Sequence, residues 1–226
     1  MPVFRLIDDL IFPATDLAEP EGLLAIGGDL SPERLLMAYT SGIFPWYSEG
    51  EPLLWWSPSP RLVLFPEEFH LPRSLRRTIN KNKFTVTADT AFADVIASCS
   101  KASHRDQDGT WITTAMQQAY IRLHELGFAH SIECWHEGTL AGGLYGVCID
   151  SFFFGESMFT TITDASKVAL ATLIKEAPTL NIAIIDCQMT TEHLLRFGAR
   201  EISREHFQEQ LEAHIDTCRP QKKWRL

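Results

Sequence analysis

The sequence predicts an α+β protein, in which a small N-terminal lobe precedes a larger domain built on a mixed, mostly antiparallel sheet. Residues 1–61 are rich in glycine, proline and aromatic side chains, and they carry one clear helix. From about residue 62 onward, helical and strand-like periodicities alternate regularly. A chain of 226 residues is long enough for one large domain and a smaller lobe. We therefore expect domains at 1–61 and 62–226.

The helix of the N-terminal lobe has start and stop signals of its own. Ser31 is suited to the N-cap, Pro32 to the first helical position, and Gly42 follows the last helical residue. The rest of the lobe is predicted to form turns and short extended pieces that carry aromatic side chains. Trp55 and Trp56 among them are expected to be buried anchors.

The larger domain is predicted as a series of helices and strands. In order, these are a basic helix (about 72–81), a strand (83–87), a helix (91–99), a helix starting near Ile112 and closed by Gly127, strands at 130–135, 140–149 and 151–155, a helix (164–177), a strand (181–188), a short helix (192–197) and a last strand and helix. His136-Glu137-Gly138 predicts a hairpin turn between two of the strands. This order resembles the GNAT (N-acetyltransferase) fold, which by itself does not define a chemistry.

Composition excludes several classes of protein. The chain is 45% hydrophobic and 22% charged, and no segment approaches the roughly 18 apolar residues of a membrane span. Five widely spaced cysteines without a C-x-x-C motif favour reduced thiols over disulfides or zinc ligands. The histidines show no metal-ligand spacing either. We therefore expect a cytoplasmic protein without a metal, a cofactor or a membrane partner.

One basic segment stands out in a chain whose net charge is −9. Residues 71–88 contain no acid, and on a helix Arg73, Arg76, Arg77 and Lys81 share one face. Such a face is usually only a solvated surface. In an acidic protein, the segregation of cations onto one helix makes it a candidate for contacting RNA phosphates.

Asp186-Cys187-Gln188 ends an apolar run that reads as a buried strand. Strand alternation places Asp186 and Gln188 on one face and Cys187 on the other, where it is expected to be a packed thiol. A carboxylate and an amide at a strand end could orient a nucleophile. Taken alone, such a pair is more often a strand end whose polar groups are satisfied.

Several short blocks are distributed from about residue 12 to 208. These include Gly22-Leu23-Leu24-Ala25-Ile26-Gly27-Gly28-Asp29, Gly42-Ile43-Phe44-Pro45-Trp46-Tyr47, Leu54-Trp55-Trp56-Ser57-Pro58, Gly109-Thr110-Trp111-Ile112-Thr113, Phe154-Gly155-Glu156-Ser157-Met158-Phe159 and Ile185-Asp186-Cys187-Gln188. Together they resemble the blocks of the leucyl/phenylalanyl-tRNA–protein transferase family. The resemblance implies transfer of Leu or Phe from Leu-tRNA or Phe-tRNA to proteins or peptides with N-terminal Arg or Lys. The peptide bond would form without the ribosome and would mark the acceptor for N-end-rule degradation.

The resemblance also implies roles for individual residues. Gln188 would accept a hydrogen bond from the attacking amine, Asp186 would orient and polarise the Gln188 amide, and Glu156 would meet the cationic acceptor. Trp46 and Trp111 would stack on the terminal adenosine of the tRNA. The pocket for the aminoacyl side chain would be lined by Leu144, Phe153, Met158, Leu170, Leu173 and Ile185.

Three alternatives stay open. A CoA-dependent GNAT N-acetyltransferase would need a glycine-containing loop for pyrophosphate, whereas residues 160–165 contain no glycine. A non-enzymatic module that binds tRNA or peptide would not need Asp186, Gln188 and Glu156 together. A hydrolase with Cys187 as its nucleophile is the third.

Overall fold

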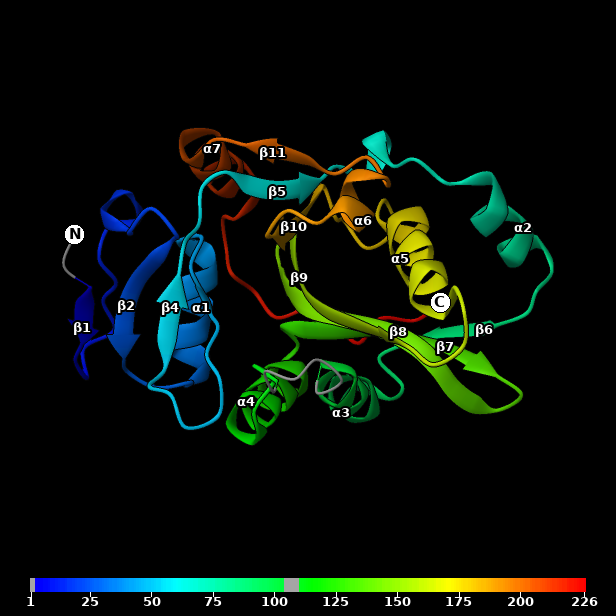
Figure 1. Cartoon of the computed structure of the whole chain (residues 1–226), viewed down its shortest axis with the longest axis horizontal. Helices are drawn as coiled ribbons and strands as arrows, with labels where there is room; N and C mark the ends of the chain where they lie inside the picture. Colours follow the sequence, from blue (N-terminus) through cyan, green and yellow to red (C-terminus); the bar gives the residue numbers. More distant parts are fainter. Residues whose placement is uncertain (1–2, 104–109) are drawn as a thin grey trace.

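The computed structural model describes residues 3–103 and 110–226, so Gly109 of the block around Trp111 lies outside the described residues. The strands are β1 (Phe4–Leu6), β2 (Leu23–Gly27), β3 (Phe44–Pro45), β4 (Leu54–Trp56), β5 (Arg61–Leu64), β6 (Thr85–Ala88), β7 (Ala129–His136), β8 (Thr139–Ile149), β9 (Phe152–Thr160), β10 (Ile184–Gln188) and β11 (Arg200–Ile202). The helices are η1 (Thr15–Leu17), α1 (Pro32–Thr40), η2 (Pro66–Glu68), α2 (Arg73–Asn80), α3 (Phe92–Ser103), α4 (Thr114–Leu126), α5 (Ala165–Glu176), α6 (Glu192–Leu195) and α7 (Arg204–His214). Figure 1 shows their arrangement.

A four-stranded sheet of order β1-β2-β4-β3, together with α1, forms the N-terminal lobe (Figure 1). The predicted start of α1 is confirmed, because the Ser31 side chain accepts a hydrogen bond from the Arg34 amide. Gly42 takes a left-handed backbone conformation (φ 76°) beyond the end of the helix, which suits glycine. Trp55 is fully buried, whereas Trp56 is partly exposed.

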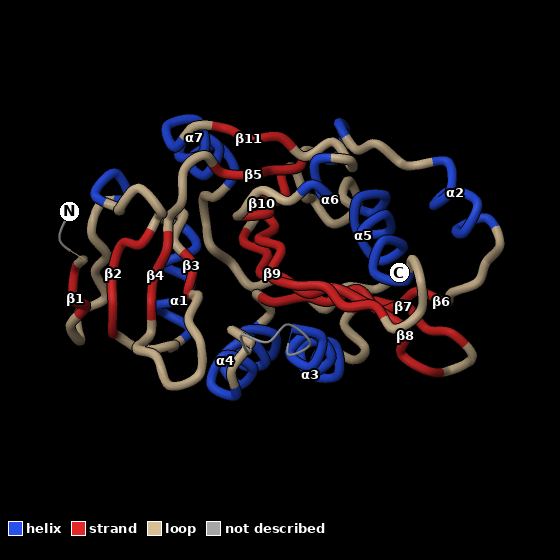
Figure 2. The backbone as a smooth tube through the Cα atoms, in the orientation of Figure 1, coloured by secondary structure: helices blue, strands red, loops and turns tan. Residues whose placement is uncertain are grey.

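The second sheet is mixed, as predicted, and has the strand order β11-β5-β10-β9-β8-β7-β6. Its β9–β10 pair is parallel, whereas the other pairs are antiparallel. Helices α3 and α4 cover one face, and α5 covers the other (Figure 2). The predicted GNAT-like architecture is therefore present.

The two sheets share a hydrophobic core. One cluster of buried side chains joins Leu35, Tyr39 and Trp55 of the lobe to Phe92 and Tyr120 of the larger domain. The division into domains 1–61 and 62–226 stays a prediction, since this core runs across it.

Some elements differ from the sequence prediction. Strand β5 was not expected, because Arg61–Leu64 is short, flanked by Pro60 and Pro66, and buried on both faces without alternation. Strand β9 runs to Thr160 rather than stopping at Gly155. Its second half mixes polar and apolar residues without regular alternation, and of these residues only Phe159 is buried. Helix α3 extends to Ser103, four residues beyond the predicted end at Cys99.

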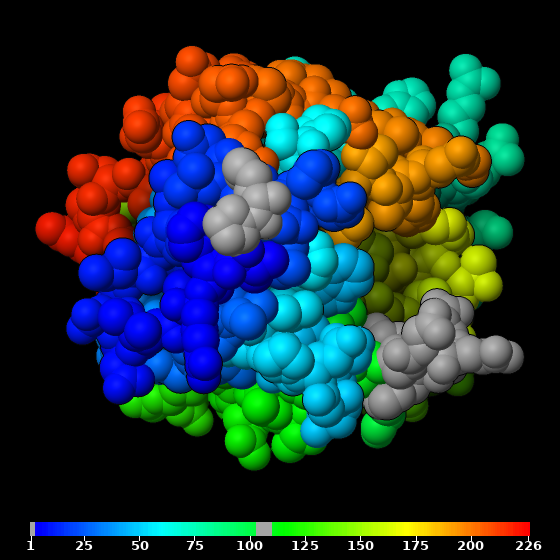
Figure 3. Space-filling model, turned by 60° about the vertical axis from the view of Figure 1, so that its left-hand side comes forward, coloured from blue at the N-terminus to red at the C-terminus, as the bar shows by residue number. Residues whose placement is uncertain are grey.

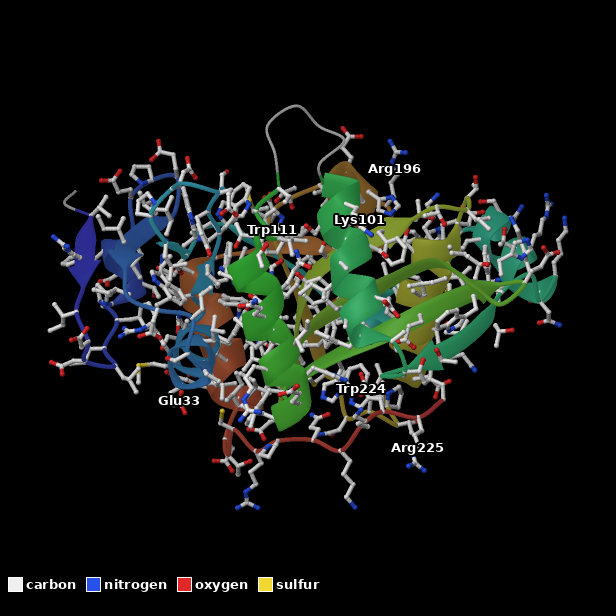
Figure 4. All side chains as sticks on the ribbon, turned by 90° about the horizontal axis from the view of Figure 1, so that it is seen from below. Glu33, Lys101, Trp111, Arg196, Trp224 and Arg225 are labelled. Atoms are coloured by element: carbon white, nitrogen blue, oxygen red, sulfur yellow. The ribbon has the colours of Figure 1, made fainter. Side chains whose placement is uncertain are left out.

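The segment after α7 returns across the larger domain. The Trp224 main-chain N–H donates to Asp89 at 2.7 Å, and the indole stacks on the His130 ring with centroids 4.2 Å apart. Figure 4 shows Trp224 turned towards the body of the protein and Arg225 pointing away from it. In the part of the chain that the structure describes, no helix is long and apolar enough to cross a membrane.

A buried ion pair lies where the lobe meets the larger domain. The Arg61 guanidinium donates from Nε and Nη2 to the two carboxylate oxygens of Asp186, at 2.9 and 2.7 Å, and both side chains are buried. Its Nη1 donates to the Gly42 carbonyl of the lobe, and its plane lies against the rings of Phe44 and Phe207. In Figure 3 the blue and cyan surface of the lobe adjoins the orange surface formed by residues near α7.

We predict that Arg61→Met lowers the free energy of unfolding by about 3–5 kcal/mol, because it leaves the buried Asp186 carboxylate without a counter-ion. Urea unfolding measures this loss. The matched control is Arg122→Met, since Arg122 pairs with Glu125 at a site where the two side chains are 58% and 57% exposed. It is expected to change stability by no more than ~0.5 kcal/mol. An equally small effect of both substitutions would contradict the prediction.

Candidate active site

Two cavities meet where β9 and β10 separate. The strands pair from Ile184↔Phe152 to Asp186↔Phe154, and the pairing stops there. One cavity, of about 350 Å³, and a second, of about 290 Å³, both lie at this opening. They share the lining residues Glu156, Cys187, Gln188 and Thr191. A ligand could therefore occupy both cavities and pass the polar side chains at the shared rim.

The larger of the two cavities is mostly apolar. All six residues predicted for the aminoacyl pocket line it: Leu144, Phe153, Met158, Leu170, Leu173 and Ile185. They come from β8, β9, α5 and β10, which surround the space between the diverging strands. His193 and Leu194 of α6 complete the wall.

The smaller cavity has aromatic walls. Trp46 and Trp111, predicted to stack on adenosine, both line it, together with Phe44, Pro45 and Met189. Trp46 is 37% exposed, and Trp111 lies just before the N-terminal end of α4 (Figure 4). Flat, partly exposed rings at a cavity wall can hold a planar base without reading its identity.

Strand β10 ends in a bulge that breaks the expected alternation. The register with β5 shifts between Asp186 and Gln188, and Gln188 has a left-handed backbone (φ 54°). Asp186 therefore lies inward against Arg61, while Cys187 lines both cavities. The Asp186 carboxylate accepts a hydrogen bond from the main-chain N–H of Gln188 at 2.9 Å, rather than contacting its side-chain amide.

Glu156 is placed at the rim by a second bulge. Tyr145 pairs with Ser157 and Gly146 with Gly155, so Glu156 has no partner on β8. The Tyr39 hydroxyl lies 2.7 Å from its Oε1 and the Tyr120 hydroxyl 3.0 Å from its Oε2, so each tyrosine forms a hydrogen bond with the carboxyl group. Burial raises the pKa of this carboxyl from 4.5 to about 7, although the two tyrosine hydroxyls act in the opposite direction.

The side-chain amide of Gln188 also faces Glu156. Its Nε2 lies 3.5 Å from Oε1, which is a long contact. With the nitrogen turned towards Glu156, the carbonyl oxygen of the amide is available to accept a hydrogen bond from a ligand. The rim thus offers one acceptor and one carboxyl group side by side.

Sequence reasoning missed Tyr39, Tyr120 and Arg61. Tyr39 and Tyr120 lie on the buried faces of α1 and α4, where they look like ordinary core residues until their hydroxyls are placed. Arg61 follows a proline-rich turn and contacts a residue 125 positions later. The one available signal was an arginine at the head of an apolar tetrapeptide.

Comparison with known proteins identifies the family. Residues 63–212 match the family model described as leucyl/phenylalanyl-tRNA protein transferase, and residues 28–59 match the model of that family's N-terminal domain. The chain belongs to the leucyl/phenylalanyl-tRNA protein transferase family. The resemblance of the sequence blocks is thereby confirmed.

Several curated relatives carry the family's name. A leucyl/phenylalanyl-tRNA–protein transferase from Syntrophobacter fumaroxidans is 60% identical over 207 residues, which cover 92% of this chain and 88% of the relative. One from an Anaeromyxobacter species is 54% identical and covers 100% of this chain and 96% of its own. The solved structure of FemX superposes with a TM-score of 0.51 and 12% identity, covering 76% of this chain and 66% of FemX, which shows a shared fold alone.

The basic helix of this family member lies apart from the two cavities. Arg73, Arg76, Arg77 and Lys81 are all exposed, whereas Leu75 on the other side of α2 is buried. Among the described residues, none of these four cations forms an ion pair with a carboxylate. A small cavity of about 130 Å³, lined by residues that include Ser74, Lys167, His193 and Arg196, lies between α2 and the apolar cavity.

We predict that the apolar cavity tolerates added volume. Leu173→Phe should cost less than ~1.5 kcal/mol of stability, because the larger ring can extend into the cavity. The matched control, Leu123→Phe on the packed face of α4, should cost about 1–3 kcal/mol. Urea unfolding compares the two variants. Equal losses would show that the cavity does not accept a larger side chain.

Proposed function

We propose that the protein transfers Leu or Phe from aminoacyl-tRNA to the N-terminal Arg or Lys of an acceptor protein. The observation that carries the proposal is the meeting of an apolar cavity and a tryptophan-walled cavity at Glu156 and Gln188. Membership of the transferase family supports transfer from a charged tRNA to a protein. The product would carry an N-terminal residue that marks it for N-end-rule degradation.

The two cavities fit the two ends of the donor. The apolar cavity takes the Leu or Phe side chain, while Trp46 and Trp111 hold the terminal adenosine. The ester that joins them then falls at the shared rim. A pocket of this kind selects by size and shape. The flexible Met158 in its wall adapts to a branched aliphatic or a flat aromatic group.

The chemistry is aminolysis of an ester that is already activated. An α-amine has a pKa near 7.7–8.0, so a useful fraction of the acceptor is neutral near pH 7. Gln188 accepts a hydrogen bond from that amine and aims its lone pair at the ester carbonyl. The C–N bond forms, the C–O bond to the ribose breaks, and the amine proton passes to the ribose oxygen. Asp186 and Arg61 act as positioning residues, because they fix the Gln188 main chain.

A CoA-dependent acetyltransferase fits this site less well. At the start of α5, the place where CoA pyrophosphate would bind, the carboxylate of Asp164 is held by Thr78 and Lys167. An anion next to a pyrophosphate is unfavourable, and the turn before it has no glycine to bring its amides close.

Covalent catalysis by Cys187 is also disfavoured. Burial raises the pKa of its thiol, so the reactive thiolate is scarce at neutral pH.

A transfer assay tests the proposal. Purified protein is incubated with radiolabelled Leu-tRNA or Phe-tRNA and a peptide that begins with Arg or, as the control, with an acidic residue. We expect label on the Arg peptide alone.

Gln188→Ala should slow transfer by about 10–100-fold with tRNA affinity nearly unchanged, because it removes a positioning acceptor. The exposed Gln118→Ala serves as the matched control. Unaltered transfer by Gln188→Ala would remove that residue from the mechanism.

The salt dependence of tRNA binding tests the role of α2 separately. We predict that Arg76→Ala/Arg77→Ala weakens tRNA binding and lowers the slope of log K against log salt by about 1 per lost phosphate contact. Binding titrations over a range of salt concentrations measure this. The control is Arg122→Ala/Lys175→Ala, which removes two exposed cations from α4 and α5. An equal change in both double variants would indicate a general charge effect rather than contact at α2.

A further inference from the structure

We infer that Glu156 is held as a neutral carboxylic acid in a closed ring of hydrogen bonds with Tyr39 and Tyr120, and that a cationic acceptor binds there as the acid releases its proton. The claim that Glu156 is protonated concerns the protein alone. The claim that a cationic acceptor displaces this proton rests on the proposed function.

The ring consists of three side chains, two tyrosine hydroxyls and one carboxyl group, each in contact with the other two. The Tyr39 hydroxyl contacts Glu156 Oε1 at 2.7 Å, and the Tyr120 hydroxyl contacts Oε2 at 3.0 Å. The two tyrosine hydroxyls also form a hydrogen bond with each other. Tyr39 and Tyr120 are fully buried, so no water competes for these contacts from the tyrosine side.

Counting protons decides the charge of the carboxyl group. Each of the three contacts needs one proton between its two oxygen atoms, and each tyrosine supplies one. With Glu156 ionised, only two protons are available, so one contact would bring two lone pairs together. With Glu156 protonated, all three contacts are hydrogen bonds that run in one direction around the ring.

The neighbours of each carboxyl oxygen indicate where the third proton lies. Oε1 is faced by the Tyr39 hydroxyl and by the amide nitrogen of Gln188, both of which can donate. Oε1 is therefore the carbonyl oxygen. Oε2 carries the proton and donates to Tyr120, Tyr120 donates to Tyr39, and Tyr39 donates to Oε1.

Among the residues that the structure describes, the cation that acts on Glu156 is Arg61, which is already paired. Arg61 is engaged by both oxygens of Asp186, so that pair contributes little net charge. Within the part of the chain that the structure describes, the titratable or charged groups that act on Glu156 include Tyr39 on α1, Tyr120 on α4, Tyr145 on β8, Arg61 on β5 and Asp186 on β10. A desolvated carboxylate without a counter-ion is costly, which favours the neutral form. Burial, which raises the pKa of Glu156 to about 7, likewise favours the neutral acid at pH 6.

The arrangement makes acceptor binding a proton exchange. An arriving ammonium or guanidinium group supplies the missing counter-ion, and the carboxyl proton passes to the solvent. Both tyrosines then donate to the carboxylate, at the expense of the hydrogen bond between them. Tyr39 and Tyr120 are thus positioning residues that satisfy Glu156 in both states. An acceptor without a cation would leave the ring intact and gain nothing from it.

Infrared spectroscopy of the free protein tests the ring without any substrate. We expect the C=O stretching band of a protonated carboxylic acid at pH 6, absent in Glu156→Gln and titrating near pH 7. Tyr120→Phe should move the band to higher frequency, because the acid O–H loses its acceptor. The exposed Glu125→Gln should leave it unchanged. A spectrum of Glu156→Gln identical to that of the unaltered protein at pH 6 would overturn the inference.

Stability against pH gives a second readout. The folded pKa of about 7 exceeds the ordinary 4.5, so the stabilising effect of Glu156 is present below 4.5 and lost as pH rises through 7. An amide mimics the neutral acid. We expect Glu156→Gln to unfold at the same temperature as the unaltered protein at pH 4, and roughly 5 °C higher at pH 8. A variant less stable at both pH values would show that Glu156 is needed as an anion.

Calorimetry of acceptor binding tests the exchange of the Glu156 proton for a cationic acceptor. At pH 6, binding of an Arg peptide in buffers of different ionisation enthalpy should release about one more proton from the unaltered protein than from Glu156→Gln. Equal proton release would overturn the exchange even where the infrared band is present. If the peptide does not bind at all, the proposed acceptor is wrong, while the infrared result still decides the ring.

Discussion

The buried ion pair between Arg61 and Asp186 sets the position of most groups around the site. Arg61 ties β5 to β10 and reaches the Gly42 carbonyl of the N-terminal lobe. Asp186 also holds the main-chain N–H of Gln188, which maintains the bulge and turns that side chain towards Glu156. A buried pair adds little net stability, but its two-point geometry fixes orientation closely. Here the pair fixes the end of β10 relative to both parts of the molecule.

The position of Glu156 also depends on contacts between the N-terminal lobe and the larger domain. Its carboxyl group lies on β9, yet its hydrogen-bond partners come from α1 of the lobe and from α4. The rim is therefore assembled from elements that are distant in sequence, and it exists only when the lobe is packed in place. This explains why Tyr39 belongs to the shared hydrophobic core while its hydroxyl belongs to the site.

Local signals in the sequence were sufficient for much of the fold. The Ser31 cap, the Gly127 helix end and the Glu137-Gly138 turn all act within a few residues, and the structure has each of them. The six residues of the apolar cavity were predicted with the help of the family resemblance, because no periodicity in the sequence distinguishes them from ordinary core residues. The Gln188 bulge and the contacts of Arg61, Tyr39 and Tyr120 could not be predicted. They depend on a left-handed backbone and on partners 19 to 125 residues away.

The contact of Trp224 with Asp89 and His130 has a consequence for how the chain is made. Trp224 is synthesised after Asp89 and His130, so a growing polypeptide carries these two residues without the indole until residue 224 has been added. The ring then stacks onto a sheet that has already formed, and the main chain supplies the last N–H donor to Asp89. A chain stalled before this point presents an uncovered sheet face to chaperones and proteases.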